Sequence, residues 1–189
     1  MESFFIADCH FGHRNIVKGI SQWTDKSACR KFNNLHEHDD LLINNINNTV
    51  GQNDRLYILG DFSFGGKENI PIYRERIVCK DVVLIRGNHD LHMMKNSVVM
   101  HNNKYINVNS LFSNVYDLLD FKIGKTNIVL CHFPILSWHR QSKGSIHLYG
   151  HVHKELNFND GAICVSAECN NFKPFSFDQI QKIISNRLN

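Results

Sequence analysis

Five short apolar segments that each run directly into a polar cluster leave this 189-residue chain few folds to adopt. The segments read SFFIADCH from residue 3, RLYILGDF from residue 55, DVVLIRGNHD from residue 81, NIVLCHFP from residue 127 and SIHLYGHVH from residue 145. Short runs that are rich in branched and aromatic side chains and end in turn-forming residues are typical of β-strands. We therefore expect five strands to deliver polar side chains to the same end of the fold.

Three further segments predict helices. Residues 33–48 show helical spacing of apolar side chains behind an asparagine that can cap the first turn, and residues 70–80 hold Pro71 in a first-turn position. At the carboxyl end of the sequence, Ser176 and Gln179 form a capping-box pattern ahead of the apolar face in IQKIISNRL.

These elements predict an α/β (α+β) fold, with a mixed sheet or two packed sheets flanked by helices and polar loops at the carboxyl ends of the strands. Strands near 105–123 and 162–168 have no comparable helices between them, so we expect the second half to be more antiparallel. The length is typical of a single domain, 1–189.

Side chains that commonly bind metals gather at these strand ends. They are Asp8, His10, Asp61, Asn88, His132, His151 and His153. In an extended segment residues i and i+2 point the same way, so the pairs in DCH and HVH can each present two ligands to one place, while Cys9 and Val152 face into packing.

The number of candidate ligands favours two metals over one. A closed single site takes about four protein ligands, and the strand ends offer seven. Two metals roughly 3.5–4 Å apart that share one carboxylate would use all of them. We infer a dinuclear site bridged by an aspartate. Imidazole and carboxylate ligands suit Mn²⁺, Zn²⁺, Fe²⁺ or Ni²⁺ better than Mg²⁺ or Ca²⁺, and we expect Mn²⁺ first.

The order of the motifs, D-x-H, G-D, G-N-H-D, a lone His and G-H-x-H, resembles the calcineurin-like metallophosphoesterase superfamily. The longer stretches FFIADCHFGHRNI, CHFPILSW and LYGHVH resemble in particular small phosphoesterases of bacteria and phages. This resemblance implies a single-domain, two-sheet β-sandwich flanked by helices, with the active site at the carboxyl ends of the strands.

The resemblance also implies a role for each matched residue. Asp8, His10 and His153 would hold the first metal. Asn88, His132 and His151 would hold the second, and Asp61 would bridge the two. His89 would lie outside the metal shell and contact the phosphate or the leaving group as the catalytic acid, with Asp90 as its orienting partner.

The implied activity is hydrolysis of a small phosphodiester or phosphomonoester, such as a nucleotide or cyclic nucleotide, by a water that two metals activate. GDFSFGG in the second motif and Asp90 in place of Glu argue against the protein phosphatase branch. Two alternatives stay open: a nuclease that acts on DNA or RNA ends, and a non-catalytic scaffold that keeps the fold. A long basic groove would favour the nuclease, and loss of ligands would favour the scaffold.

Several other residues are candidates for substrate binding because they lie close in sequence to predicted ligands. They are His13, Arg14, Arg86, Trp138, His139 and Arg140.

Composition limits the partners and the location. No apolar run approaches the roughly 20 residues that a membrane-spanning helix needs, so no membrane partner is expected. MESFFIADCH lacks the basic and long apolar regions of a signal peptide, which favours the cytoplasm, or the host cytoplasm if a phage encodes the chain. The formal net charge of +3 makes nucleic-acid binding possible without indicating it, and the oligomeric state stays open.

Overall fold

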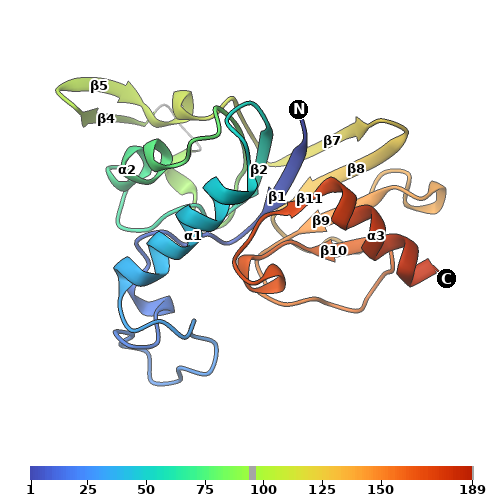
Figure 1. Ribbon diagram of the computed structural model, residues 1–189, viewed down its shortest axis with the longest axis horizontal. Helices are drawn as coiled ribbons and strands as arrows, with labels where there is room; N and C mark the ends of the chain where they lie inside the picture. Colours follow the sequence, from blue (N-terminus) through green and yellow to red (C-terminus); the bar gives the residue numbers. More distant parts are fainter. Residues whose placement is uncertain (94–96, 189) are drawn as a thin grey trace.

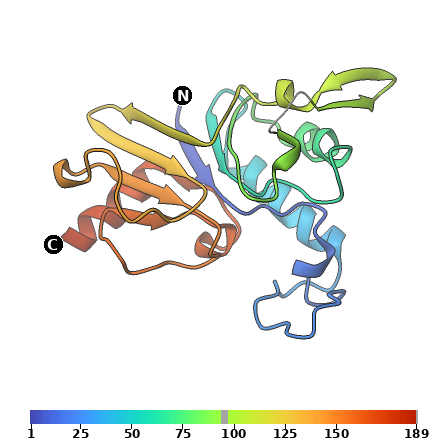
Figure 2. The same ribbon diagram turned by 180° about the vertical axis from the view of Figure 1, so that it is seen from behind.

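Two packed β-sheets form the centre of the fold in the computed structural model, which describes residues 1–93 and 97–188 (Figures 1 and 2). The first sheet has the strand order β11-β1-β2-β3-β6 and the second has the order β10-β9-β8-β7. The first sheet comprises β1 (Ser3–Ile6), β2 (Arg55–Leu59), β3 (Asp81–Ile85), β6 (Asn114–Tyr116) and β11 (Phe175–Ser176). The second comprises β7 (Leu118–Ile123), β8 (Thr126–Cys131), β9 (Ile146–Tyr149) and β10 (Ala162–Cys164). The predicted α/β two-sheet fold is confirmed.

Side chains alternate between the two faces of the first sheet, and both faces are buried. On β2, Tyr57 and Leu59 face the second sheet, where they meet Ile128 and Leu148, whereas Ile58 faces the helices on the other side. Because successive side chains of a strand point to opposite faces, a strand that is covered on both sides needs apolar residues throughout. This arrangement explains the continuous apolar runs in the sequence.

Three helices flank the sheets. They are α1 (Leu35–Thr49), α2 (Asn69–Arg76) and α3 (Phe177–Leu188). The first two cover the outer face of the first sheet, and α3 lies beside the second sheet near β10 and β11 (Figure 1). Within the described ranges, no helix combines the length and the apolar character that crossing a membrane requires.

The helix ends follow the predicted chemistry. The Asn34 side chain accepts a hydrogen bond of 2.9 Å from the Glu37 backbone N–H and so caps α1. At α3, Ser176 Oγ accepts from the Gln179 N–H at 3.2 Å and Gln179 Oε1 accepts from the Ser176 N–H at 2.8 Å, as a capping box requires. The second helix ends at Arg76, earlier than the predicted 70–80, because Ile77 is already extended.

The second half of the chain is more antiparallel than the first, as expected: β7 pairs antiparallel with β8, β11 with β1, and the two strands within residues 98–107 with each other, whereas β1, β2 and β3 are parallel. In the second sheet β8, β9 and β10 are all parallel, and only β7 runs antiparallel to its neighbour. Two loops connect these parallel strands, residues 132–145 between β8 and β9 and residues 150–161 between β9 and β10. The first loop contains the 3₁₀ turn η4 (Gln141–Lys143). These two parallel connections were not expected, because parallel strands are usually joined through a helix, whereas here loops return the chain without one.

Smaller elements complete the chain. They are a hairpin of β4 (Val98–His101) and β5 (Lys104–Asn107) and the 3₁₀ turns η1 (Arg14–Ile16), η2 (Leu91–Met93), η3 (Val108–Leu111) and η5 (Ala167–Asn170). The hairpin stands apart from the two sheets at the upper left of Figure 1.

Candidate metal centre

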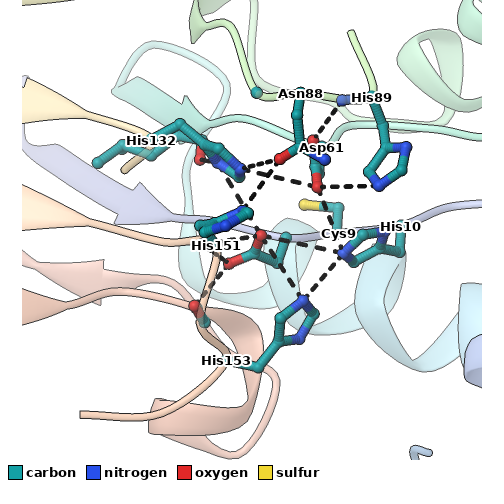
Figure 3. Close-up of polar contacts among 12 residues, drawn as sticks. Cys9, His10, Asp61, Asn88, His89, His132, His151 and His153 are labelled. Atoms are coloured by element: carbon teal, nitrogen blue, oxygen red, sulfur yellow. Dashed lines mark hydrogen bonds and ion pairs between the residues drawn. The ribbon is translucent and has the colours of Figure 1, made fainter. Parts of the chain in front are cut away.

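The loops that follow β1, β2, β3, β8 and β9 bring all seven predicted ligand side chains to one place. Figure 3 labels each of them except Asp8. Parallel strands end at the same edge of a sheet, so their carboxyl-terminal loops are neighbours. The segment after β1 lies between the two sheets' loops, because the Ala7 N–H donates to the Val165 carbonyl and the Asp8 N–H donates to the Gly60 carbonyl. Residues from both sheets therefore meet around Asp8.

The first group of ligand atoms comes from Asp8, His10 and His153. Nε2 of His10 and Nε2 of His153 are 3.1 Å apart, and Asp8 Oδ1 lies 3.9 Å and 3.8 Å from them. Two imidazole nitrogens that are each about 2.0–2.1 Å from one cation stand roughly this far apart. The group is therefore spaced to hold a metal ion.

The second group comes from Asn88, His132 and His151. Asn88 Oδ1 lies 3.1 Å from His132 Nε2 and 3.0 Å from His151 Nδ1. In the neutral His132 ring, Nδ1 carries the proton and donates it to the Leu59 carbonyl at 2.8 Å, so Nε2 presents a bare lone pair. A lone pair that faces an amide oxygen is unfavourable unless a cation lies between them.

Asp61 is the carboxylate that both groups share. Its Oδ2 atom lies 3.7 Å from His10 Nε2 and 3.7 Å from His132 Nε2, one nitrogen from each group. Asp8 also approaches His132, at 4.0 Å, but it does so at the Nδ1 atom that is already committed to a backbone carbonyl. Asp61 is thus the carboxylate in position to bridge two cations.

The donor set fits two divalent cations. The converging atoms are carboxylate oxygens, an amide oxygen and imidazole nitrogens, all of which act as electron-pair donors toward transition metals. The tautomers agree with this assignment, because His153 pairs through Nδ1 with the Glu168 carboxylate at 2.7 Å and so frees Nε2.

The backbone presents these ligands differently from the extended geometry that was expected. The backbone angle φ is positive, between 52° and 70°, at five of the candidate ligands: Asp8, His10, Asp61, His151 and His153. A left-handed conformation in a residue other than glycine costs roughly 1–2 kcal/mol, and such residues concentrate at functional sites. The chain therefore turns sharply at each ligand. Cys9 and Val152 still face into packing, as expected.

Two glycines that precede ligands are required by close packing. A Cβ atom on Gly60 would lie 2.3 Å from His132 Nδ1, and one on Gly87 would lie 2.3 Å from Asp61 Oδ1. Neither distance is sterically possible, so any other residue would displace a ligand. The crowding of the site thus explains why glycine occupies these positions in G-D and G-N-H-D.

Asp90 does not orient His89, and that prediction requires correction. Asp90 Oδ2 accepts from the N–H groups of Asp61 and Gly87, both at 2.8 Å, and Oδ1 accepts from the Phe62 N–H at 3.0 Å. The side chain therefore ties the loop after β2 to the loop after β3. Burial raises the pKa of Asp90 to about 6, although these backbone donors act to lower it.

His89 lies beside the two ligand groups without joining either. Its Nε2 atom is 4.0 Å from Asp61 Oδ2, and its side chain is 46% exposed. The His89 backbone N–H donates to Asp61 Oδ1 at 2.9 Å, and its ring packs against Phe64 with centroids 4.5 Å apart. The imidazole is accordingly held next to the Asp61 carboxylate, where it is partly exposed.

Three residues behind the ligands escaped the sequence prediction. Glu168 accepts from His153 Nδ1 and from Arg30 Nε, both at 2.7 Å, and the buried Arg30 guanidinium also donates to the carbonyls of Cys9 and Asp8. Ser166 Oγ donates to Asp8 Oδ2. These residues lie in loops or at the start of a short 3₁₀ turn, with no motif or periodicity to mark them.

Burial and neighbouring charges perturb protonation throughout the site. Burial raises the pKa of Asp8, whereas burial followed by the charge of Arg30 places the pKa of His10 well below its usual value. Burial opposes ionisation of Glu168, but His153 and Arg30 outweigh it and hold its pKa at about 2. Burial likewise acts to lower the pKa of His153, but the Glu168 hydrogen bond outweighs it and raises that pKa. Glu168 is therefore an ionised partner for His153.

A cavity of about 380 Å³ opens directly over the ligands. It is lined by His10, His13, Ile16, Trp23, Ala28, Asp61, Phe64, Asn88, His89, His151, Val152 and His153. Of the predicted substrate contacts, His13 lines this cavity, with its pKa lowered to about 4, first by burial and then by the charge of His89. The exposed Arg14 does not line it.

The remaining predicted contacts lie elsewhere. Arg86 pairs with the exposed Asp117, with 2.8 Å between its Nε and Oδ1. Trp138 is buried, and its indole N–H donates to the Ser145 carbonyl. Because β8 and β9 are parallel, the loop after His132 runs back to the amino end of β9. It carries Trp138, His139 and Arg140 away from the ligands, which explains why proximity in sequence misled the prediction.

Exchanging Glu168 for glutamine should weaken metal binding. Glutamine keeps the size of the side chain but loses the charge that fixes the His153 tautomer, and loss of such a partner typically costs 10–100-fold in metal affinity. Calorimetric titration of the metal-free protein with Mn²⁺ measures this effect. The exposed Glu68→Gln change is the matched control. Equal affinity in both variants would show that Glu168 does not support the site.

Comparisons with known proteins extend over nearly the whole chain. No protein-family model matches it. The chain is 30% identical to the uncharacterized protein MJ1445 of Methanocaldococcus jannaschii over 96% of its own length and 90% of that protein. The protein of unknown function AQ665 from Aquifex aeolicus has a similar fold, with a TM-score of 0.66, 20% identity, and coverage of 96% of this chain and 98% of the other. The Escherichia coli phosphoesterase YfcE is less similar, with a TM-score of 0.44, 16% identity, and coverage of 89% of this chain and 80% of the other. This similarity is too weak to assign an activity.

Proposed function

Because the chain belongs to the same family as the uncharacterized M. jannaschii protein MJ1445, whose name assigns no activity, we propose a function from the site itself: metal-dependent hydrolysis of a small phosphate ester. The observation that carries the proposal is the pair of ligand groups that share Asp61, whose Oδ2 atom is 3.7 Å from a histidine nitrogen of each. This arrangement fits two divalent cations, with Mn²⁺ as the first candidate and Zn²⁺, Fe²⁺ or Ni²⁺ as alternatives.

Two cations would supply Lewis-acid chemistry to a phosphate ester, neutralising charge on its oxygens and making a water more acidic. Asp8, His10 and His153 would hold one cation and Asn88, His132 and His151 the other, with Asp61 between them. Asn88 contributes a neutral oxygen, so the site would keep a net positive charge toward an anionic substrate.

Proton transfer to the departing oxygen falls to His89. Its half-exposed ring borders the cavity beside the bridging carboxylate, within reach of a group bound there. A positioned general acid of this kind typically contributes 10²- to 10⁴-fold to the rate. Asp90 acts at a distance by holding the loops that carry Asp61 and His89 in register.

The cavity favours a small ester over a nucleic acid. Its volume of about 380 Å³ matches pockets for small molecules. In the part of the chain that the structure describes, no Lys or Arg lines it, whereas nucleic-acid grooves depend on such cations. Nucleotides and cyclic nucleotides are the substrate class that we propose. A non-catalytic scaffold that keeps the fold would not need a complete set of metal ligands.

Metal removal and return test this proposal. Treatment with EDTA followed by dialysis should abolish hydrolysis of bis(p-nitrophenyl) phosphate or p-nitrophenyl phosphate, and added Mn²⁺ should restore it, because the ligand atoms cannot polarise a phosphate unaided. Release of p-nitrophenol is followed by absorbance, with Zn²⁺, Ni²⁺ and Fe²⁺ in parallel. A metal-loaded protein that hydrolyses neither ester would contradict the proposal.

A further inference from the structure

One wall of the cavity is aromatic and apolar and adjoins the ligand groups, since the rings of His13 and Phe64 lie with their centroids 5.3 Å and 5.2 Å from that of His10. His13, Ile16, Trp23, Ala28 and Phe64 form this wall, and they come from the segment that follows β1 and from the loop after β2. The same cavity is lined by Asp61 and His89. A molecule that reaches the metal centre therefore also contacts this wall.

The rings of the wall are stacked and held in place. His13 lies flat on Phe64, with centroids 3.7 Å apart and an interplanar angle of 6°, and Trp23 meets His13 edge to face at 5.7 Å and 77°. Backbone hydrogen bonds hold the loop that carries Trp23, since the Arg30 N–H donates to the Ile16 carbonyl and the Lys18 N–H donates to the Arg30 carbonyl. Trp23 itself is 42% exposed and so has free ring surface.

Charge is confined to the metal end of the cavity. Arg30 lies behind the ligands, where it is buried and already engaged by Glu168 and the carbonyls of Asp8 and Cys9. No described Lys or Arg side chain faces the cavity to balance a second phosphate. A ligand with one phosphoryl group and an uncharged remainder suits this distribution.

We propose that Trp23, His13 and Phe64 form a subsite for a flat, uncharged ring of the substrate, such as a nucleobase. The single phosphoryl group of that substrate would lie at the candidate metal centre around Asp61. This proposal rests on the proposed phosphoesterase activity. The subsite would recognise the part of the substrate that the metal ligands do not select. Stacking of a base on an aromatic side chain contributes about 5- to 100-fold in affinity, judged by removal of the side chain.

The test compares two cyclic phosphodiesters that differ in the presence of a base. In Mn²⁺-loaded protein, kcat/KM is measured for adenosine 2′,3′-cyclic monophosphate and for glycerol 1,2-cyclic phosphate. The ratio of the two should favour the nucleotide and should fall about 5- to 100-fold in Trp23→Ala, mainly through KM. Trp23→Phe should restore most of the ratio. The matched control is Tyr105→Ala on the distant hairpin, where the ring is 76% exposed and the ratio should not change.

Each outcome separates the subsite from the activity. If both esters are hydrolysed and Trp23→Ala leaves the ratio unchanged, the subsite is wrong and the proposed function stands. If neither ester is hydrolysed, the proposed function fails for this substrate class, and calorimetric titration with adenosine 5′-monophosphate decides the subsite. Weaker binding by Trp23→Ala than by Tyr105→Ala would then support it, and equal binding would overturn it.

Discussion

Replacing Asp61 with asparagine is expected to lower the metal content from two ions per chain to less than one and to reduce kcat/KM by about 10²- to 10⁴-fold. The amide keeps the shape of the side chain, but it removes the negative charge that stands 3.7 Å from a ligand nitrogen of each group. Charge stabilisation by bound metals contributes several kcal/mol, and each 1.4 kcal/mol corresponds to a factor of ten. Metal content is measured by elemental analysis after dialysis, and activity with bis(p-nitrophenyl) phosphate.

The control for this change is Asp160→Asn, which alters an exposed aspartate outside the candidate site. It should retain both metals and full activity. If Asp61→Asn also bound two ions and turned over normally, Asp61 would not be the shared ligand, and the assignment of two groups around it would fail.

Replacing His89 with alanine should separate chemistry from metal binding. The variant is expected to keep two metals, because the ligand atoms meet without the His89 ring, and to lose about 10²- to 10⁴-fold in kcat, because the proton donor is gone. Metal content and turnover are measured on the same preparation.

His92→Ala provides the matched control, since His92 is exposed in the short turn η2 that follows the same loop. It should change neither quantity. A collapse of metal content in His89→Ala would identify His89 as a ligand and would remove its role as the acid.

The sequence predicted the parts of the structure that repeat a simple physical pattern. Apolar strands that end in polar residues were recognisable because both faces of the first sheet are buried, as for Ile58 and Leu59 on β2. Helix caps at Asn34 and Ser176 were recognisable because capping depends on a few neighbouring residues. The convergence of the ligands followed from the placement of parallel strand ends along one edge.

Features that depend on three-dimensional packing escaped prediction. The left-handed backbone at Asp8 and His151 has no local signature, since it is imposed by the crowding of several loops. Glu168 supports His153 from a segment far from any motif. Trp138 lies next to a ligand segment in sequence but is carried to the opposite edge of the sheet by a crossover loop.

The role of Asp90 also depends on three-dimensional packing. It was predicted to orient His89, but it connects two loops instead. Its position next to His89 suggested a direct contact, yet its oxygens accept backbone donors at residues 61, 62 and 87. Only the folded loops show that the three donors surround the carboxylate. The residue remains important to the site through the position of Asp61.

Crystals grown with Mn²⁺ and measured at the manganese absorption edge would locate the metals themselves. We expect two anomalous peaks roughly 3.5–4 Å apart, one on each side of the Asp61 carboxylate. One peak should lie among Asp8, His10 and His153, and the other among Asn88, His132 and His151. A single peak, or peaks away from Asp61 in crystals saturated with Mn²⁺, would contradict the dinuclear site.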